Sequence, residues 1–122
     1  MTGREVYQRA VALLGQEETD VGYYPALALV CLNQMLADCL GEQNALDQAF
    51  GKHSFVTAPE LLELEDEVPY HERMVSECFP YRLAALLVAG EDRKEYNRLT
   101  QEYEERLAKY SPCCLIEMRG TG

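Results

Sequence analysis

The sequence predicts an all-α fold, a bundle of about four helices with a long central loop and an extended C-terminal tail. Apolar residues recur at helical spacing in four stretches, and start and stop signals flank these stretches. No internal repeat, low-complexity tract or linker divides them. At 122 residues with 48% hydrophobic side chains, residues 1–122 have room for one domain with a modest core.

The first helix is predicted at about residues 3–15. Thr2 and Glu5 have the spacing of a capping box, in which each side chain satisfies a backbone N–H group of a starting helix. Gly15 is a plausible stop. The apolar positions follow an i, i+4, i+7 pattern, at Val6, Ala10, Leu13 and Leu14.

The second helix is predicted at about residues 25–40. Pro25 suits a first helical turn, where a missing N–H group is tolerated. Gly41 would take the left-handed cap position that ends the helix. Since nearly every face of this stretch is apolar, we expect a central helix that is covered on several sides.

A long loop is predicted at residues 42–68. Its first part, residues 42–60, mixes glycine, proline and polar residues with aromatic ones and shows no sustained period. Loops of this length are uncommon in a compact domain unless they have a function. We therefore expect this loop to be partly functional.

The third helix is predicted at about residues 69–89. Pro69 can open it, and Gly90 ends it at a tight turn. Pro80 lies inside the pattern and removes one backbone hydrogen bond, so we expect a kink or a break there.

The fourth helix is predicted at about residues 91–110 and forms a hairpin with the third through Gly90. Glu91 and Asp92 cap its start. An inner stripe follows one face, at Tyr96, Leu99, Tyr103, Leu107 and Tyr110. Such a stripe is usually core, with hydroxyl groups at the rim. An excess of tyrosine over tryptophan also suits a domain whose faces meet other copies, and Arg93 and Arg98 lie on the charged remainder.

Residues 111–122 form a short apolar tail that could be a strand or an ordered arm. The chain has five cysteines, an odd number at scattered positions, which argues against a disulfide framework. The sequence contains no CxxC pair with a nearby histidine, so it does not suggest a zinc site. No apolar stretch approaches membrane-spanning length, so we expect a soluble, intracellular protein without membrane contact.

The net charge of −10 is concentrated in one segment. Residues 1–59 carry three basic and seven acidic groups, residues 60–72 carry six acidic groups alone, and residues 73–122 carry eight of each. The acidic surface comprises Glu60, Glu63, Glu65, Asp66 and Glu67. A surface of this sign repels phosphate, which disfavours nucleic-acid binding and leaves open a role in which DNA passes nearby without specific binding.

Candidate catalytic residues are few. His71, beside Glu67 and Glu72, could support acid–base chemistry, but an exposed histidine at a helix start is the simpler interpretation. Glu60 and Glu63, and Glu102 and Glu105, have the spacing of magnesium-binding acids in all-α nucleotide pyrophosphohydrolases, but arginines interleave the second pair. We therefore expect that the protein is not an enzyme. We expect it to have no catalytic residue and to bind no metal and no cofactor.

The second half of the chain, PYHERMVSECFPYRLAALLVAGEDRKEYNRLTQEYEERL, resembles the C-terminal helical hairpin of bacteriophage head–tail connector (neck) proteins. These proteins show an acidic segment, an "lPyxLAaxL" helix, a short acidic turn and a helix with spaced tyrosines. The opening, MTGREVYQRAVALLG, is also similar to the start of such proteins from phages and prophages of Gram-positive bacteria. Cys113 and Cys114 lie outside this pattern.

The resemblance implies a helical subunit that assembles into a homo-oligomeric ring, commonly of twelve copies, beneath the portal protein. The ring would extend the DNA channel, with assembly in the bacterial host cytoplasm and a final place in the virion neck beside other neck and tail proteins. The acidic loop would project toward the channel or a neighbouring ring. The fourth helix, with Tyr96, Tyr103, Tyr110, Arg93 and Arg98, would contact the next subunit, and Cys113, Cys114, Leu115 and Ile116 would dock on a partner.

A second interpretation stays open. The chain could be a small all-α adaptor or regulatory protein that binds one protein partner through the C-terminal tail and the tyrosine face.

Overall fold

The computed structural model describes residues 1–15 and 25–110. Within these ranges the chain forms five α-helices and a short 3₁₀ turn: α1 (Gly3–Leu13), α2 (Pro25–Asp38), α3 (Leu40–Ala49), α4 (Glu72–Val88), α5 (Arg93–Leu107) and η2 (Ala108–Tyr110). No β-strand occurs in the described ranges, although Thr2 and Glu67 form an isolated antiparallel bridge. The all-α prediction is therefore confirmed.

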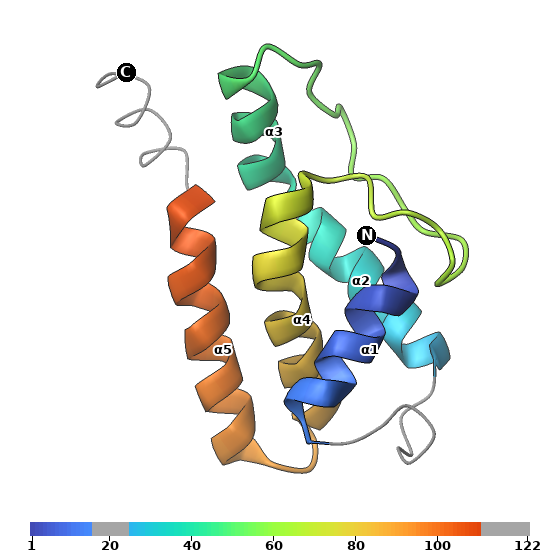
Figure 1. Ribbon diagram of the computed structural model, residues 1–122, viewed down its shortest axis with the longest axis vertical. Helices are drawn as coiled ribbons and strands as arrows, with labels where there is room; N and C mark the ends of the chain where they lie inside the picture. Colours follow the sequence, from blue (N-terminus) through green and yellow to red (C-terminus); the bar gives the residue numbers. More distant parts are fainter. Residues whose placement is uncertain (16–24, 111–122) are drawn as a thin grey trace.

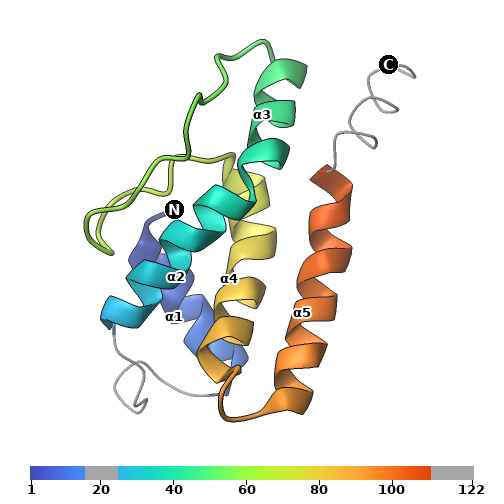
Figure 2. The ribbon, with the colours of Figure 1, turned by 180° about the vertical axis from the view of Figure 1, so that it is seen from behind.

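α4 is the central helix. It packs against α5 on one side and against α1 and α2 on the other (Figures 1 and 2). Ten of its 17 residues are buried, whereas α2 has four buried residues among 14. The prediction that residues 25–40 form the covered central helix is thus wrong, because Leu27 and Val30 remain 44% and 66% exposed.

The predicted loop at residues 42–68 is wrong in its first part, where α3 forms. Gly41 lies inside α3 and does not take a left-handed cap conformation, since positive φ angles among the described glycines occur at Gly15 (73°) and Gly51 (69°). The pattern of α3 is hard to recognise because two of its three buried residues, Gln43 and Asp47, are polar. The stop predicted at Gly15 is confirmed.

The other helix ends agree with the sequence to within a few residues. Thr2 and Glu5 form the predicted capping box, and the carboxylate of Asp92 accepts a hydrogen bond from the N–H of Glu95 at 3.0 Å. α4 begins three residues after Pro69, and it continues through Pro80 as one helix, so the predicted break is absent. Local capping chemistry therefore marks the starts of α1 and α5.

The core lies where α4 meets its neighbours. Its largest fully buried side chains come from α1, α2, α4 and α5: Tyr7, Phe79, Leu32, Met35, Leu36, Met74, Leu83 and Leu99. In the described part of the chain, no helix has the length and apolar character needed to span a membrane. Residues 50–71 leave the end of α3, pass the N-terminal end of α1 and return to the start of α4 (Figure 1).

Candidate functional site

Residues 60–68, the acidic segment, are packed onto the N-terminal end of α1. Backbone hydrogen bonds run from Gly3 N–H to Asp66 O (3.0 Å), from Arg4 N–H to Leu64 O (2.7 Å) and from Val68 N–H to Met1 O (2.9 Å). The apolar members of the segment are buried: Leu61, Leu64 and Val68. The segment therefore does not project freely from the bundle, in contrast to the loop predicted there.

Several of the acidic side chains have partners within the chain. Glu67 accepts from the Met1 ammonium at 2.9 Å, and this hydrogen bond raises the pKa of the ammonium. Arg4 donates to Glu65 at 2.8 Å, which lowers the pKa of that carboxyl. Asp66 instead accepts from the backbone N–H groups of Leu62 (2.8 Å) and Glu63 (3.1 Å).

Glu60 and Glu63 are exposed and face solvent. They are thus the members of the predicted acidic surface that the fold leaves most available for a channel or a neighbouring molecule. The acidic surface that could repel phosphate is smaller than the sequence predicts. Glu65 and Glu67 form salt bridges, and Asp66 accepts backbone hydrogen bonds within a turn.

Two asparagines fix the connection between α3 and α4. Asn33 of α2 donates to Leu61 O (3.1 Å) and accepts from Leu61 N–H (2.7 Å). Asn44 of α3 makes the same pair of bonds with Phe55, at 3.1 and 2.9 Å. Each side-chain amide therefore acts like one residue of a β-ladder and holds an extended chain against a helix.

Two of the three tyrosines in the predicted stripe pack into the core of the same chain: Tyr103 of α5 and Tyr110 of η2. The Tyr103 hydroxyl lies 3.1 Å from Sγ of Cys39 in a buried contact, and burial raises the pKa of both groups, that of Cys39 to about 11. The Tyr110 hydroxyl donates to Glu77 at 2.7 Å. Both tyrosines are less than 10% exposed.

The predicted roles on this face are therefore divided. Tyr103 and Tyr110 hold α5 to the bundle, so the expectation that they form a subunit interface is corrected, and the Tyr103 hydroxyl is not at the rim. Tyr96 is half-buried, while Arg93 and Arg98 are exposed, and these three stay available for a contact between subunits. The predicted docking tail lies outside the described residues: Cys113, Cys114, Leu115 and Ile116.

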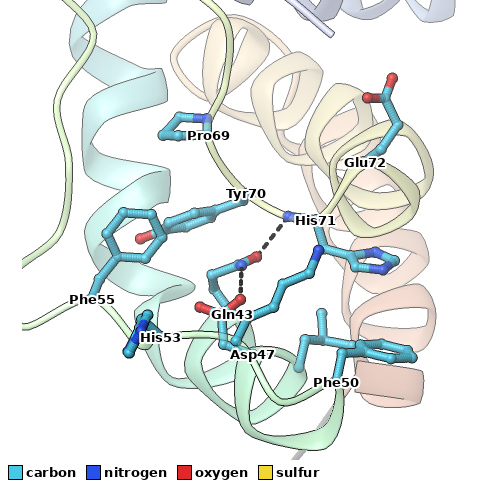
Figure 3. A pocket seen from close by; sticks show the side chains of 11 residues that line it. Gln43, Asp47, Phe50, His53, Phe55, Pro69, Tyr70, His71 and Glu72 are labelled. Atoms are coloured by element: carbon cyan, nitrogen blue, oxygen red, sulfur yellow. Dashed lines mark hydrogen bonds between the residues drawn. The ribbon is translucent and has the colours of Figure 1, made fainter.

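A pocket of about 380 Å³ lies between α3, the chain that follows it and the start of α4 (Figure 3). A polar chain crosses its floor: the His71 N–H donates to Gln43 Oε1 at 2.7 Å, and Gln43 Nε2 donates to Asp47 Oδ1 at 3.0 Å. The second carboxylate oxygen, Asp47 Oδ2, is buried and has no hydrogen-bond partner among the described residues. Asp47 is 6% exposed.

Aromatic rings form the walls of this pocket. Phe55 and Tyr70 lie with ring centroids 5.6 Å apart on one side, and Phe50 stacks on His71 at 5.6 Å on the other. Figure 3 shows Asp47 between these walls, close to His53. The pocket thus combines flat apolar surfaces with two polar atoms that lack a partner among the described residues, Asp47 Oδ2 and His71 Nδ1, which is a binding geometry.

The acid–base arrangement considered for His71 is not formed. Nδ1 of His71 has no hydrogen-bond partner in the described part of the structure, and Glu67 and Glu72 are ion-paired with the Met1 ammonium instead. Without a carboxylate to orient the ring, His71 lacks the second member of a catalytic pair.

The paired acids do not form a magnesium cage. Glu60 and Glu63 lie in a non-helical segment, and Glu102 accepts a hydrogen bond from Arg106 at 2.9 Å. Over residues 1–15 and 25–110, no three His, Cys, Asp or Glu side chains converge as a metal site would require. The cysteines in these ranges, Cys31, Cys39 and Cys78, are free thiols.

Three large apolar side chains are exposed on α2 and on the segment that Asn33 holds against α2. Leu27 and Val30, three residues apart on α2, lie on the same side of that helix. Asn33 fixes Leu61 against the next turn of α2, and the neighbouring Leu62 is 87% exposed. We call Leu27, Val30 and Leu62 the α2 face. Two further large apolar side chains are exposed at and after the end of α3: Phe50 is 62% exposed and Val56 is 96% exposed.

No protein-family model, no curated protein and no solved structure matches the chain.

Proposed function

We propose that the chain is a non-enzymatic structural protein of the bacteriophage head–tail connector type, which works by assembling with copies of itself. In this proposal the subunits form a ring beneath the portal protein and extend the DNA channel. Assembly takes place in the bacterial host cytoplasm, and the ring contacts other neck and tail proteins in the virion.

The exposed α2 face is the observation that carries this proposal. Single exposed apolar residues are common on soluble proteins, but a group at one edge marks an interaction surface. Val30 is 66% and Leu62 is 87% exposed, and Leu27 is 44% exposed. A covering partner would remove this apolar area from water, which favours association.

The positions of α2 and α5 suit a ring. The two helices lie on opposite sides of α4 (Figure 2), so a contact between the α2 face of one subunit and α5 of the next repeats in one direction. Head-to-tail contacts of this kind generate closed rings when the rotation between subunits closes. An α2-to-α2 contact would give a dimer and nothing larger.

Charge supports the same pairing. Arg93 and Lys94 are exposed at the start of α5, and Glu60 and Glu63 are exposed next to the α2 face. Opposite charges on two complementary surfaces favour correct register and faster encounter. The adaptor interpretation is less favoured, since it needs the tyrosine face, and Tyr103 and Tyr110 are used within the chain.

The test is the mass of the full chain in solution, measured by sedimentation velocity and native mass spectrometry over a range of concentrations. We expect oligomers that increase with concentration, and we expect Val30→Glu to abolish them. Val56→Glu is the matched control, because it places the same charge on an even more exposed valine away from the α2 face. Equal association by wild type and Val30→Glu, or a wild type that stays monomeric at every concentration, would contradict the proposal.

A further inference from the structure

The pocket between α3 and the start of α4 holds a polar atom that the fold does not satisfy. Asp47 is 6% exposed, and its Oδ2 atom has no donor among the described residues. Buried polar atoms are nearly always hydrogen-bonded, and a buried carboxylate oxygen without a donor is costly. A ligand that donates a hydrogen bond to this oxygen would remove that cost, and the removed cost would add to the free energy of binding.

Two neighbouring polar groups, the Gln43 amide and the Tyr70 hydroxyl, are already engaged, whereas Nδ1 of His71 also has no partner among the described residues. The Gln43 side-chain amide accepts from the His71 N–H and donates to Asp47 Oδ1, so it does not donate to Oδ2. The Tyr70 hydroxyl donates to the backbone O of Leu36 at 2.5 Å and points away from the carboxylate. Asp47 Oδ2 is thus the acceptor that the pocket offers to an incoming donor, and the Lys52 ammonium, which lines the same pocket, is the cation that a ligand would meet there.

The walls specify the shape of that group. The rings of Phe55 and Tyr70 are tilted by 54° with centroids 5.6 Å apart, and Asp47 lies between them and the backbone of α3 (Figure 3). A cation is attracted to aromatic faces, and a guanidinium is planar, weakly hydrated and rich in donors. An ammonium is more strongly hydrated and offers no flat surface.

We propose that this pocket binds an arginine side chain presented by another protein, with Asp47 accepting from the guanidinium and the wall formed by Phe55 and Tyr70 on one side of it. The volume of about 380 Å³ is at the lower end of the roughly 300–1,000 Å³ typical of ligand pockets, which suits one side chain. The net charge of −10 favours a basic partner over an acidic one. This site is separate from the α2 face and does not depend on self-association.

The test uses the isotope-labelled full chain and N-acetyl-L-arginine N-methylamide as the probe, followed by amide NMR. We expect shifts of the Phe55 and His71 backbone amides and of the Gln43 side-chain amide. The citrulline analogue, which replaces the guanidinium with a neutral urea of the same shape, is the matched ligand control and should bind much more weakly. The lysine analogue should also bind more weakly than the arginine probe.

Three variants separate the possible outcomes. Asp47→Asn keeps an acceptor for Gln43 and should weaken binding by about tenfold or more, because it removes a charge-assisted hydrogen bond. Phe55→Leu removes one aromatic wall and leaves the carboxylate in place, and it should weaken binding several-fold. Lys52→Met removes the ammonium that lines the same pocket and should retain or tighten binding.

The proposal is overturned if neither wild type nor Lys52→Met shows shifts at these amides with the arginine probe. It is also overturned if Asp47→Asn binds as tightly as wild type, or if the citrulline analogue binds equally well. None of these results bears on the oligomeric mass of the chain, so failure here is distinguishable from failure of the ring.

Discussion

Asn33 provides the sharpest test of how the acidic segment is held. Its side-chain amide replaces a β-ladder partner for Leu61, with bonds of 2.7 and 3.1 Å. We expect Asn33→Ala to destabilise the protein, because it removes both bonds and puts no other group in reach. The backbone N–H and C=O of Leu61, a residue that is 5% exposed, would then lack their partner.

The magnitude follows from these two bonds. A hydrogen bond contributes about 0.5–1.5 kcal/mol net, and a buried group left without a partner costs about 1–3 kcal/mol. Both groups are part-buried, and water can reach them after some rearrangement, so we expect a loss of about 2–4 kcal/mol in the free energy of unfolding. This is a large fraction of the roughly 5–15 kcal/mol typical of small domains.

Urea denaturation followed by circular dichroism measures this change as a shift of the midpoint at constant slope. Hydrogen exchange should report the same event locally, with faster exchange at the Leu61 amide and neighbouring positions. Gln34→Ala is the matched control: Gln34 is adjacent on α2 and makes an exposed bond to Asp38. It should change stability by less than about 0.5 kcal/mol. An Asn33→Ala variant as stable as this control would refute the reasoning.

Two further predictions test the packing at the N-terminal end and the contact that closes α5. Gly3→Ala should destabilise the protein by about 1 kcal/mol or more, because a new Cβ would lie 3.1 Å from the fixed backbone O of Leu64. Gly41→Ala, whose new Cβ would meet open space inside α3, should instead stabilise the protein by roughly 0.5–1 kcal/mol. Thermal melts of both variants measure these changes. The hydrogen bond from Tyr110 lowers the pKa of Glu77, so its contribution is present at neutral pH and is lost as the pH falls through the lowered pKa. Tyr110→Phe should therefore reduce the difference in urea midpoint between neutral pH and about pH 3, and an unchanged difference would contradict this assignment.

Capping and turn chemistry made much of the fold predictable. The Thr2–Glu5 capping box, the stop at Gly15 and the cap at Asp92 are local signals, and the structure contains each of them. The paired α4 and α5 were also recognisable, because their apolar residues follow one face at helical spacing. These features need only short-range physics.

α3 and the polar contacts that depend on it were not predictable in the same way. Its buried face contains Gln43 and Asp47, so a search for apolar periodicity finds no helix there. The spacing of Gln43, Leu46 and Asp47 at i, i+3, i+4 was the available signal, but it has meaning only once the partner at His71 is known. The asparagine bonds to Leu61 and Phe55 are likewise tertiary contacts between distant parts of the chain.

The acidic segment and the tyrosine stripe show how composition misleads about exposure. A run of carboxylates suggested a projecting loop. Leu61, Leu64 and Val68 nevertheless anchor it, and the N-terminal ammonium and Arg4 neutralise part of its charge. Tyrosines at helical spacing suggested an interface, yet Tyr103 and Tyr110 found partners inside the chain. The apolar face that stays exposed is on α2, where the sequence predicted burial.

A mixing experiment tests the central claim, head-to-tail association between the α2 face and α5, most directly. One variant carries Val30→Glu, which damages the α2 face, and the other carries Arg93→Glu together with Lys94→Glu, which reverses the charge on α5. Each should be monomeric alone, since each lacks one of the two surfaces. Native mass spectrometry of the mixture should reveal a one-to-one heterodimer, held by the intact α2 face of the second variant and the intact α5 of the first. If the mixture contains monomers alone, or if Val30→Glu by itself forms the same oligomers as the wild type, the claim is contradicted.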